Sequence, residues 1–460
     1  MAYQSVNPYD GRLVKSFDET SAIQLEAALS GAQGCFATWR DTKFSHRAAI
    51  ANKAAALMRA RVDEFARPMT LEMGKLIQEA RGEVALSADI IDYYADNAEG
   101  FLATQILAPS VGMAEISCEP LGVLFGVQPW NFPYYQLARF AAPNLMAGNV
   151  VMVKHSASVP QCALAFEKLW LDAGAPKGAY TNLFISHDQV NQVIDDPRIR
   201  GVALTGSVEA GKKVAERAGR NMKKSTMELG GSDAFIVLED ADFEKTLKWA
   251  IWAKMNNTGQ CCIAAKRFII VDAIFDQFLE RFQRALTALK PGDPMDQTTT
   301  LGPLSSEAAL VKLLEQVDRA IASGAKLVMG GTRIDRPGAF MQPTILTDIK
   351  EGNPAFSEEF FGPVALLFRV RNEQDAVDLA NQSEFGLGGS VFTGDEIRGR
   401  KIAARIDTGM VFINHPTWTA ADLPFGGIKN SGFGRELSSL GLHEFVNKKL
   451  IRVSKIDDPA

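Results

Sequence analysis

Two groups of residues that can do chemistry bracket one stretch of the chain. Glu228 lies in Glu-Leu-Gly-Gly, and Cys261 and Cys262 follow later in Gly-Gln-Cys-Cys. A cysteine becomes a nucleophile when a base or an electropositive setting favours its thiolate. Glu228 can be that base, or it can activate a water molecule that reacts afterwards. The sequence therefore predicts covalent catalysis at Cys262 or Cys261.

The elements between these groups can bring them together. Residues 234–238 form a short apolar run, and a helical pattern that opens at Asp240 or Asp242 follows it. A helix that follows a strand runs back along it, so the cysteine turn can return to the neighbourhood of Glu228.

Upstream, strands and helices alternate, which predicts a doubly wound parallel sheet. The expected strands span residues 121–127, 149–154, 180–185 and 201–205, and the expected helices span 134–146, 160–173, 189–195 and 208–220. Such sheets bind ligands beyond the carboxyl ends of their strands, where Asn131, Lys154 and Gly206–Ser207 fall. The backbone amides at Gly206–Ser207 can hold a pyrophosphate. An ordinary helix start and a solvated Lys154 are the alternatives.

The flanking segments have other roles. Residues 21–39, 45–67 and 71–100 show helical spacing, and we assign no chemistry to the third of these helices. A second α/β region follows Cys262. The tail at 445–456 alternates lysines with apolar residues, which predicts an exposed strand that pairs with another subunit.

Composition excludes several classes of protein. A length of 460 residues predicts two or three compact units, and a net charge of −5 argues against nucleic acid as a partner. The start of the chain has no leader pattern and no run is long enough to cross a bilayer, so we expect a cytoplasmic protein without membrane contact. Five scattered cysteines and histidines without ligand spacing predict neither a disulfide framework nor a metal.

Six motifs together resemble the aldehyde dehydrogenase superfamily, from about Asn7 to about Leu450. They are Pro129-Trp130-Asn131-Phe132-Pro133, Thr205-Gly206-Ser207, Glu228-Leu229-Gly230-Gly231, Gly259-Gln260-Cys261-Cys262, Glu359-Phe360-Phe361-Gly362-Pro363 and Pro424-Phe425-Gly426-Gly427. The resemblance implies NAD- or NADP-dependent oxidation of an aldehyde by an α/β protein. It also implies a doubly wound cofactor domain (residues 1–112 and 124–228), a second α/β catalytic domain (229–437) and a small β oligomerisation element (113–123 and 438–460) in a homodimer or homotetramer.

The resemblance assigns roles to individual residues. Cys262 becomes the nucleophile, Asn131 an oxyanion donor and Glu228 the base for the hydrolytic water. The expected cofactor-binding residues are Trp130, Lys154, Ser156, Gly206, Ser207, Gly211, Leu229, Glu359 and Phe361. Many NAD-specific members have a glutamate where this chain has Ala157, so we expect the use of both NAD and NADP.

The substrate inference depends on Arg139. In succinate semialdehyde dehydrogenases, which this chain resembles most, an arginine at this position contacts the distal carboxylate of the substrate, and a guanidinium suits a carboxylate. Tyr135, Gln136, His415 and Trp418 are expected to line the same tunnel. Alternatively, Arg139 forms an ordinary salt bridge and the aldehyde is uncharged or carries an amine. Two further alternatives are a cysteine acyltransferase or thioesterase without redox chemistry, and a noncatalytic protein.

Overall fold

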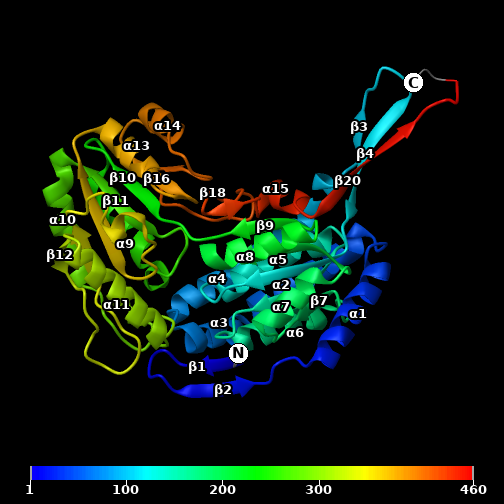
Figure 1. Cartoon of the computed structure of the whole chain (residues 1–460), viewed down its shortest axis with the longest axis horizontal. Helices are drawn as coiled ribbons and strands as arrows, with labels where there is room; N and C mark the ends of the chain where they lie inside the picture. Colours follow the sequence, from blue (N-terminus) through cyan, green and yellow to red (C-terminus); the bar gives the residue numbers. More distant parts are fainter. Residues whose placement is uncertain (1–2, 458–460) are drawn as a thin grey trace.

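The computed structural model describes residues 3–457. Two α/β lobes lie side by side, and a small sheet near the C-terminus projects away from them (Figure 1). Residues 1–2 and 458–460, which the predicted domain boundaries include, lie outside the described part of the chain. The doubly wound parallel sheet and the second α/β region are confirmed; the boundaries between domains remain a prediction.

The first lobe is built on a six-stranded sheet. Its order is β19 (Gly432–Phe433), β9 (Lys224–Glu228), β8 (Ile199–Thr205), β5 (Val123–Gln128), β6 (Val150–His155) and β7 (Tyr180–Asn182). All neighbouring strands are parallel except β19, which runs antiparallel to β9. Four helices connect these strands: α5 (Pro133–Met146), α6 (Pro160–Ala173), α7 (His187–Asp195) and α8 (Val208–Arg220).

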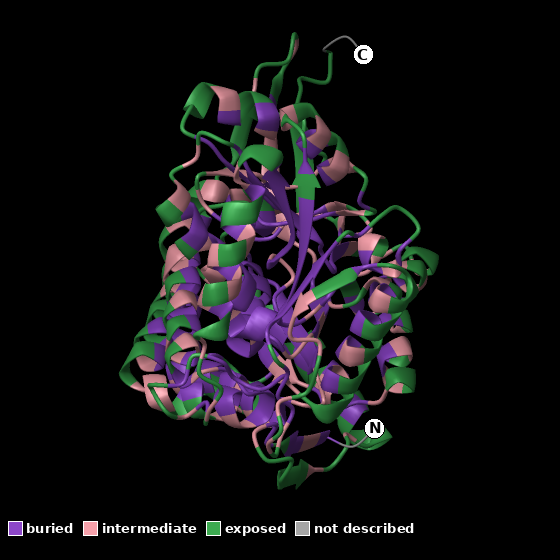
Figure 2. Ribbon diagram, turned by 90° about the vertical axis from the view of Figure 1, so that its left-hand side faces the viewer, coloured by how far each residue is buried: buried purple, intermediate pink, exposed green. Residues whose placement is uncertain are grey.

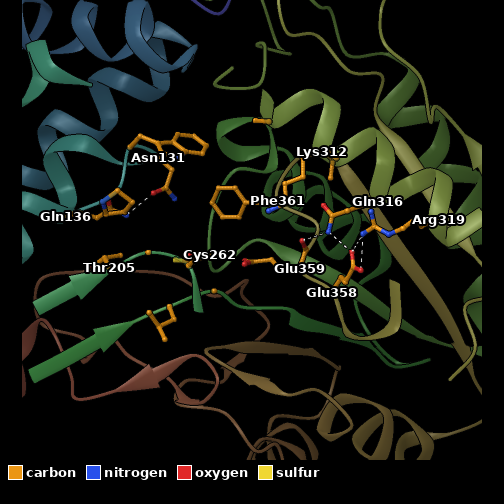
Figure 3. A pocket seen from close by; sticks show the side chains of 18 residues that line it. Asn131, Gln136, Thr205, Cys262, Lys312, Gln316, Arg319, Glu358, Glu359 and Phe361 are labelled. Atoms are coloured by element: carbon orange, nitrogen blue, oxygen red, sulfur yellow. Dashed lines mark hydrogen bonds and ion pairs between the residues drawn. The ribbon is translucent and has the colours of Figure 1, made fainter. Parts of the chain in front are cut away.

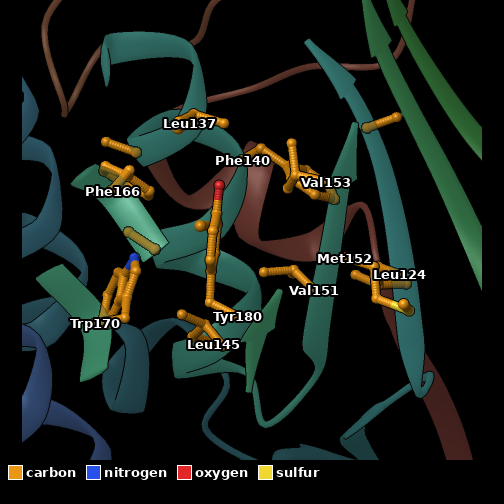
Figure 4. Close-up of a cluster of buried hydrophobic side chains, with 14 of the residues drawn as sticks. Leu124, Leu137, Phe140, Leu145, Val151, Met152, Val153, Phe166, Trp170 and Tyr180 are labelled. Carbon is orange, nitrogen blue, oxygen red and sulfur yellow. The ribbon is translucent and has the colours of Figure 1, made fainter. Parts of the chain in front are cut away.

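The central strands of this sheet are apolar throughout because helices cover both of their faces. Every residue of β6 is buried. Figure 4 shows Val151 and Val153 of this strand packed among Phe140, Phe166 and Tyr180 of the surrounding elements. Figure 2 shows buried residues gathered inside the molecule, with exposed residues over the outer surface.

Four helices before β5 cover this lobe, and their boundaries differ from the predicted ones. They are α1 (Ala22–Trp39), α2 (Phe44–Ala60), α3 (Val62–Met73) and α4 (Ile77–Phe101). The single helix expected over residues 45–67 is wrong, because Arg61 leaves helical geometry with ψ 34°. Gly74 ends α3 in the left-handed conformation at φ 78°, which glycine adopts without steric cost.

The second lobe contains a seven-stranded sheet. Its order is β12 (Lys326–Met329), β13 (Thr344–Thr347), β14 (Val364–Val370), β11 (Ala265–Val271), β10 (Asp233–Val237), β16 (Gly389–Phe392) and β17 (Phe412–Ile413). Only β12 runs antiparallel to its neighbour. The helices of this lobe are α9 (Phe243–Met255), the 3-10 turn η1 (Asn256–Gly259), α10 (Asp272–Thr287), α11 (Glu307–Ala322), α12 (Pro354–Ser357), α13 (Glu373–Asn381) and α14 (Glu396–Ala403).

The smaller elements complete the chain. A hairpin of β1 (Tyr3–Val6) and β2 (Leu13–Phe17) lies beside the first lobe, and β15 (Phe385–Gly386) pairs with β18 (Ile428–Lys429). The projecting sheet has the order β20 (Val446–Val453), β4 (Met113–Pro120), β3 (Gln105–Leu107), with α15 (Ser438–His443) just before β20. Leu450 and Val453 of β20 are 61% and 64% exposed. Within residues 3–457, no helix is long and apolar enough to cross a membrane.

Candidate active site

Cys262 lies on the wall shared by two cavities. It follows η1 and comes shortly before β11, at the amino end of a central strand of the second lobe. One cavity has a volume of about 640 Å³ and the other about 300 Å³, and Cys262 lines both. A nucleophile placed in this way can meet one ligand from each side.

The larger cavity contains most of the residues that we expected to bind a cofactor. Figure 3 shows Asn131, Cys262, Glu359 and Phe361 facing this cavity. The lining residues predicted from the sequence are Trp130, Asn131, Gln136, Gly206, Ser207, Leu229, Cys262, Glu359 and Phe361. The rest of the wall was not predicted and is formed mainly by Ala309, Lys312, Leu313, Gln316 and Arg319 of α11, together with Pro129, Thr205, Gly230 and Glu358.

The shape and donors of this cavity fit a dinucleotide. Ser207 caps α8, so the first amides of that helix are available beside the cavity. Glu359 accepts a hydrogen bond from the Gly231 amide at 3.1 Å and pairs with Lys266 at 3.2 Å. A Cβ atom at Gly230 would collide with the Glu359 carboxylate, so glycine allows this close approach.

The smaller cavity is a tunnel with aromatic side chains in its wall. Its wall includes Phe132, Tyr135, Trp252, Trp418 and Phe425, together with Glu79, Gly82, Glu83, Leu86, Gln136, Asn256, Cys261, Cys262, Ile263 and Thr419. Among these described residues there is no lysine, arginine or histidine. His415, which we expected in the wall, instead packs against Trp418 with ring centroids 5.6 Å apart.

The side chain of Asn131 is held in a fixed orientation. Its Nδ2 donates to the Gln260 carbonyl at 3.1 Å, and its Oδ1 accepts from Gln136 Nε2 at 3.0 Å. An amide nitrogen carries two hydrogens, so the second remains available for an oxyanion. Gln136, predicted to contact substrate, thus also orients Asn131.

The loop before Cys262 contains unusual backbone. Asn257 and Thr258 adopt left-handed conformations at φ 52° and 55°, and Gly259 follows at φ 75°. This geometry costs about 1–3 kcal/mol for a residue other than glycine and persists only where the surroundings enforce it. Asn257 Nδ2 donates to the carbonyls of Asn131 and Gln260 at 2.9 and 3.1 Å, which joins this loop to the Asn131 turn.

The neighbours of Cys262 shape the electrostatics of its thiol. The adjacent Cys261 thiol and burial raise the pKa of the Cys262 thiol well above its usual range. Lys266, which no motif in the sequence indicated, donates to the backbone carbonyls of Cys261 and Cys262 at 2.9 and 2.7 Å. Its side chain is fully buried, and through these two hydrogen bonds its ammonium group lies next to the loop that carries Cys262.

Glu228 lies at the carboxyl end of β9 and is 2% exposed. It is absent from the lining of both cavities. Neither carboxylate oxygen has a hydrogen-bond partner among residues 3–457, and burial raises the pKa of Glu228 well above its usual range. Gly426 lies against the carboxylate, where a Cβ atom would come within 2.7 Å of it.

The expectation that Arg139 faces the substrate cleft is not met in this structure. Its guanidinium is paired with Glu436, donates to the Tyr135 hydroxyl at 3.0 Å and donates to Thr205 at 3.2 Å. Arg139 lines neither cavity. Tyr135 is one helical turn earlier on α5, and its ring covers Arg139 from the tunnel side.

Three residues expected at the cofactor also lie outside the lining of the larger cavity. Lys154 ends β6 and is 7% exposed, and burial lowers the pKa of its amine. The Ser156 hydroxyl lies 3.0 Å from that of Ser158. Gly211 lies on the buried side of α8, where a Cβ atom would meet Leu229 at 2.5 Å.

Comparisons with known proteins find relatives over nearly the whole chain. The chain is 52% identical over 450 residues to a succinate-semialdehyde dehydrogenase [NADP(+)] of Deinococcus radiodurans, covering 98% of this chain and 94% of that protein. It is 43% identical to succinate-semialdehyde dehydrogenase [NADP(+)] 1 of Mycobacterium bovis, covering 99% and 100% of the two chains. The crystal structure of succinic semialdehyde dehydrogenase from Streptococcus pyogenes with NADP+ superimposes with a TM-score of 0.97 at 45% identity, covering 99% of this chain and 100% of that one.

The family assignment follows from the whole chain and not from the site alone. The model of the aldehyde dehydrogenase family matches residues 1–451, which include both lobes, both cavities and most of the projecting sheet. With its cysteine between a dinucleotide-sized cavity and an aromatic tunnel, this chain belongs to the aldehyde dehydrogenase family.

Proposed function

We propose that this protein oxidises succinate semialdehyde to succinate with NADP, and with NAD as a second cofactor. The observation that carries the proposal is the position of Cys262 between the two cavities. The larger cavity would hold the cofactor and the tunnel would hold the aldehyde. The relatives named for this substrate and for NADP, at 43% to 52% identity over nearly the whole chain, support the choice of both.

In the first half of the reaction the Cys262 thiolate bonds to the aldehyde carbon. The carbonyl oxygen becomes an alkoxide, which the free N–H of Asn131 Nδ2 and the backbone N–H of Cys262 stabilise. The nicotinamide of the bound cofactor supplies the acceptor for the hydride that the carbon loses. Trp130, Gly206, Ser207, Leu229, Glu359 and Phe361, which line the larger cavity, would hold that cofactor. For Lys154, Ser156 and Gly211, a cofactor contact stays a prediction from the family resemblance.

In the second half a water molecule cleaves the thioester on Cys262. Glu228 takes a proton from the water, and the new C–O bond forms as the C–S bond breaks. The proton then passes from Glu228 to the departing sulfur, so that the carboxylic acid leaves and the Cys262 thiol is restored. Because Glu228 lines neither cavity, its side chain must turn from the Gly426 loop toward Cys262 for this step.

The tunnel would recognise the substrate carboxylate through hydroxyl groups. Tyr135 and Thr419 line it, and their oxygens lie 2.7 Å apart. Arg139 donates to the Tyr135 hydroxyl oxygen from behind, which leaves the O–H hydrogen of Tyr135 to donate to an anion. His415 and Trp418 would shape the mouth of the tunnel. This arrangement replaces the direct clamp that we expected from the sequence.

The projecting sheet suggests how subunits associate. β20 presents its Leu450 and Val453 side chains to solvent, and an exposed strand of this kind commonly pairs with another chain. We propose a homodimer or homotetramer assembled through residues 113–123 and 438–460, in the cytoplasm.

The test is NADP and NAD reduction by the purified protein with succinate semialdehyde, compared with butanal, which has the same number of carbons and no carboxylate. Strong preference for the acid supports the proposal. Equal turnover of butanal would show an aldehyde dehydrogenase for uncharged substrates, which the absence of a cation from the described tunnel lining makes the second candidate. Cys262→Ser should abolish turnover, whereas Cys261→Ala should retain it.

A further inference from the structure

We propose that Lys75 and Glu83 are positioning residues, which hold the Asn131 turn so that its side chain can receive the oxyanion. The inference rests on the proposed function and adds to it two residues from one segment of the first lobe: Glu83 lies on α4, and Lys75 lies in the turn just before that helix. The two residues form an ion pair in which each side chain is 1% exposed.

Lys75 contacts the turn directly. Its Nζ donates to the backbone carbonyl of Asn131 at 2.9 Å and lies 3.6 Å from the centre of the Phe132 ring. The ammonium is thus held between Glu83, one carbonyl and one aromatic face, all of which favour a cation. Every one of these contacts fixes the turn from which the Asn131 side chain extends.

Glu83 fixes the other end of the same turn. The N-cap of α5 is Phe132, which has no side-chain acceptor, so the first amides of that helix need a partner from elsewhere. Glu83 Oε1 accepts from the backbone N–H groups of Tyr134 and Tyr135 at 2.8 and 3.1 Å. It therefore serves as a cap supplied by α4.

Glu79 lies four residues from Lys75 and four from Glu83, and it connects them to the loop before Cys262. Glu79 Oε1 accepts from the backbone N–H of Asn257 at 3.0 Å. Asn257 Nδ2 in turn donates to the same Asn131 carbonyl that Lys75 binds. The oxyanion donor and the strained loop before Cys262 are consequently held by α4 and the turn that precedes it.

Stability alone does not account for a buried ion pair at this position. Apolar residues of similar volume often stabilise a protein as well as a buried pair does, because taking two charges out of water is costly. What apolar residues cannot supply is a donor for the Asn131 carbonyl and an acceptor for the α5 amides. These hydrogen bonds specify where the turn lies.

The test is a double-mutant cycle between the ion pair and Asn131. Lys75→Met/Glu83→Gln removes both charges together, so that neither is left buried alone. It is combined with Asn131→Ala, and acylation of Cys262 is measured with succinate semialdehyde and with 4-nitrophenyl acetate. In the ester reaction the sulfur bonds to the acetyl carbon as the bond to 4-nitrophenolate breaks, so an oxyanion forms without hydride transfer.

We expect the pair substitution to slow acylation by about 10- to 100-fold when Asn131 is present, since small misplacements of catalytic groups have effects of this size. In the Asn131→Ala background the same substitution should change the rate less than about twofold, because the donor it positions is gone. Equal losses in both backgrounds would overturn the proposal. The matched control is Arg59→Met/Asp92→Asn. It removes a partly exposed ion pair between α2 and α4, leaves the exposed Asp89 without its arginine, and should leave acylation unchanged.

Two further measurements separate a failure of the positioning role from a folding defect and from a failure of the proposed function. If Lys75→Met/Glu83→Gln does not fold, as judged by its circular dichroism, Lys75→Leu/Glu83→Gln carries the same cycle, because it too removes both charges together. If the wild-type protein cleaves the ester but oxidises no aldehyde, the proposed function fails while the ester cycle still decides the positioning role. A wild-type protein that is acylated by neither compound would overturn both.

Discussion

Arg139 and Glu436 form a buried ion pair in which the side chains are 1% and 8% exposed. The carboxylate that this arginine binds therefore belongs to the protein. The arginine sits behind Tyr135, and its guanidinium also packs against the Phe425 ring at 4.6 Å. The pair closes the far side of the tunnel wall.

Replacing Arg139 should consequently destabilise the fold. Arg139→Met leaves Glu436 buried without a partner, which typically costs about 3–5 kcal/mol. The free energy of unfolding from urea titration measures this. Arg139→Met/Glu436→Gln should recover most of the loss. If Arg139→Met were as stable as the wild type and lost only its preference for succinate semialdehyde, the guanidinium would bind the substrate directly after all.

Glu228 should give the reaction a pH dependence with a defined sign. Only the carboxylate form can take a proton from water, and burial raises the pKa at which that form appears. Steady-state turnover should therefore rise with increasing pH as Glu228 loses its proton, and this rise should lie at a higher pH than the ordinary range of a glutamate. Steady-state rates across this range, beside the stopped-flow burst of reduced cofactor, provide the measurement.

The Glu228→Gln variant separates the two halves of the reaction. Its burst should persist while steady-state turnover drops by about 10²- to 10⁴-fold, because the thioester forms but is not hydrolysed efficiently. Rapid steady turnover with the wild-type pH profile would remove Glu228 from its assigned role.

Gly230→Ala should weaken cofactor binding selectively. The added methyl group would collide with the Glu359 carboxylate and displace it from the larger cavity. The KM for NADP should increase by about tenfold, which corresponds to about 1.4 kcal/mol of binding free energy. Cleavage of 4-nitrophenyl acetate, measured without cofactor, should stay near the wild-type rate. Gly219→Ala is the matched control, since no atom lies within 4 Å of the added Cβ.

Ala157→Glu should shift cofactor preference toward NAD. The new carboxylate would stand where many NAD-specific family members have one and would repel the 2′-phosphate of NADP, because like charges in a binding site are costly. The ratio of kcat/KM values for NADP and NAD should fall about tenfold or more. Ala157→Gln has nearly the same shape without the charge, so an equal shift in that variant would contradict an electrostatic origin.

The sequence by itself determined the fold class and most of the chemistry. Continuous apolar runs such as Val150–Val153 predict buried parallel strands, and the motifs around Asn131, Glu228 and Cys262 indicate the reaction class because they are local patterns. Helix starts also follow local rules, as at Ser207, whose side chain caps α8.

Only the tertiary structure decided which partners these residues have. Arg139 faces Glu436 rather than the tunnel because β19 and the segment after it pack beside β9 and α5, a contact between residues far apart in the chain. The partners of Asn131 come from the turn before α4, from α5 and from the cysteine loop in the same way. Spacing along one helix indicates which face a residue occupies, but the element that covers that face is set by long-range packing.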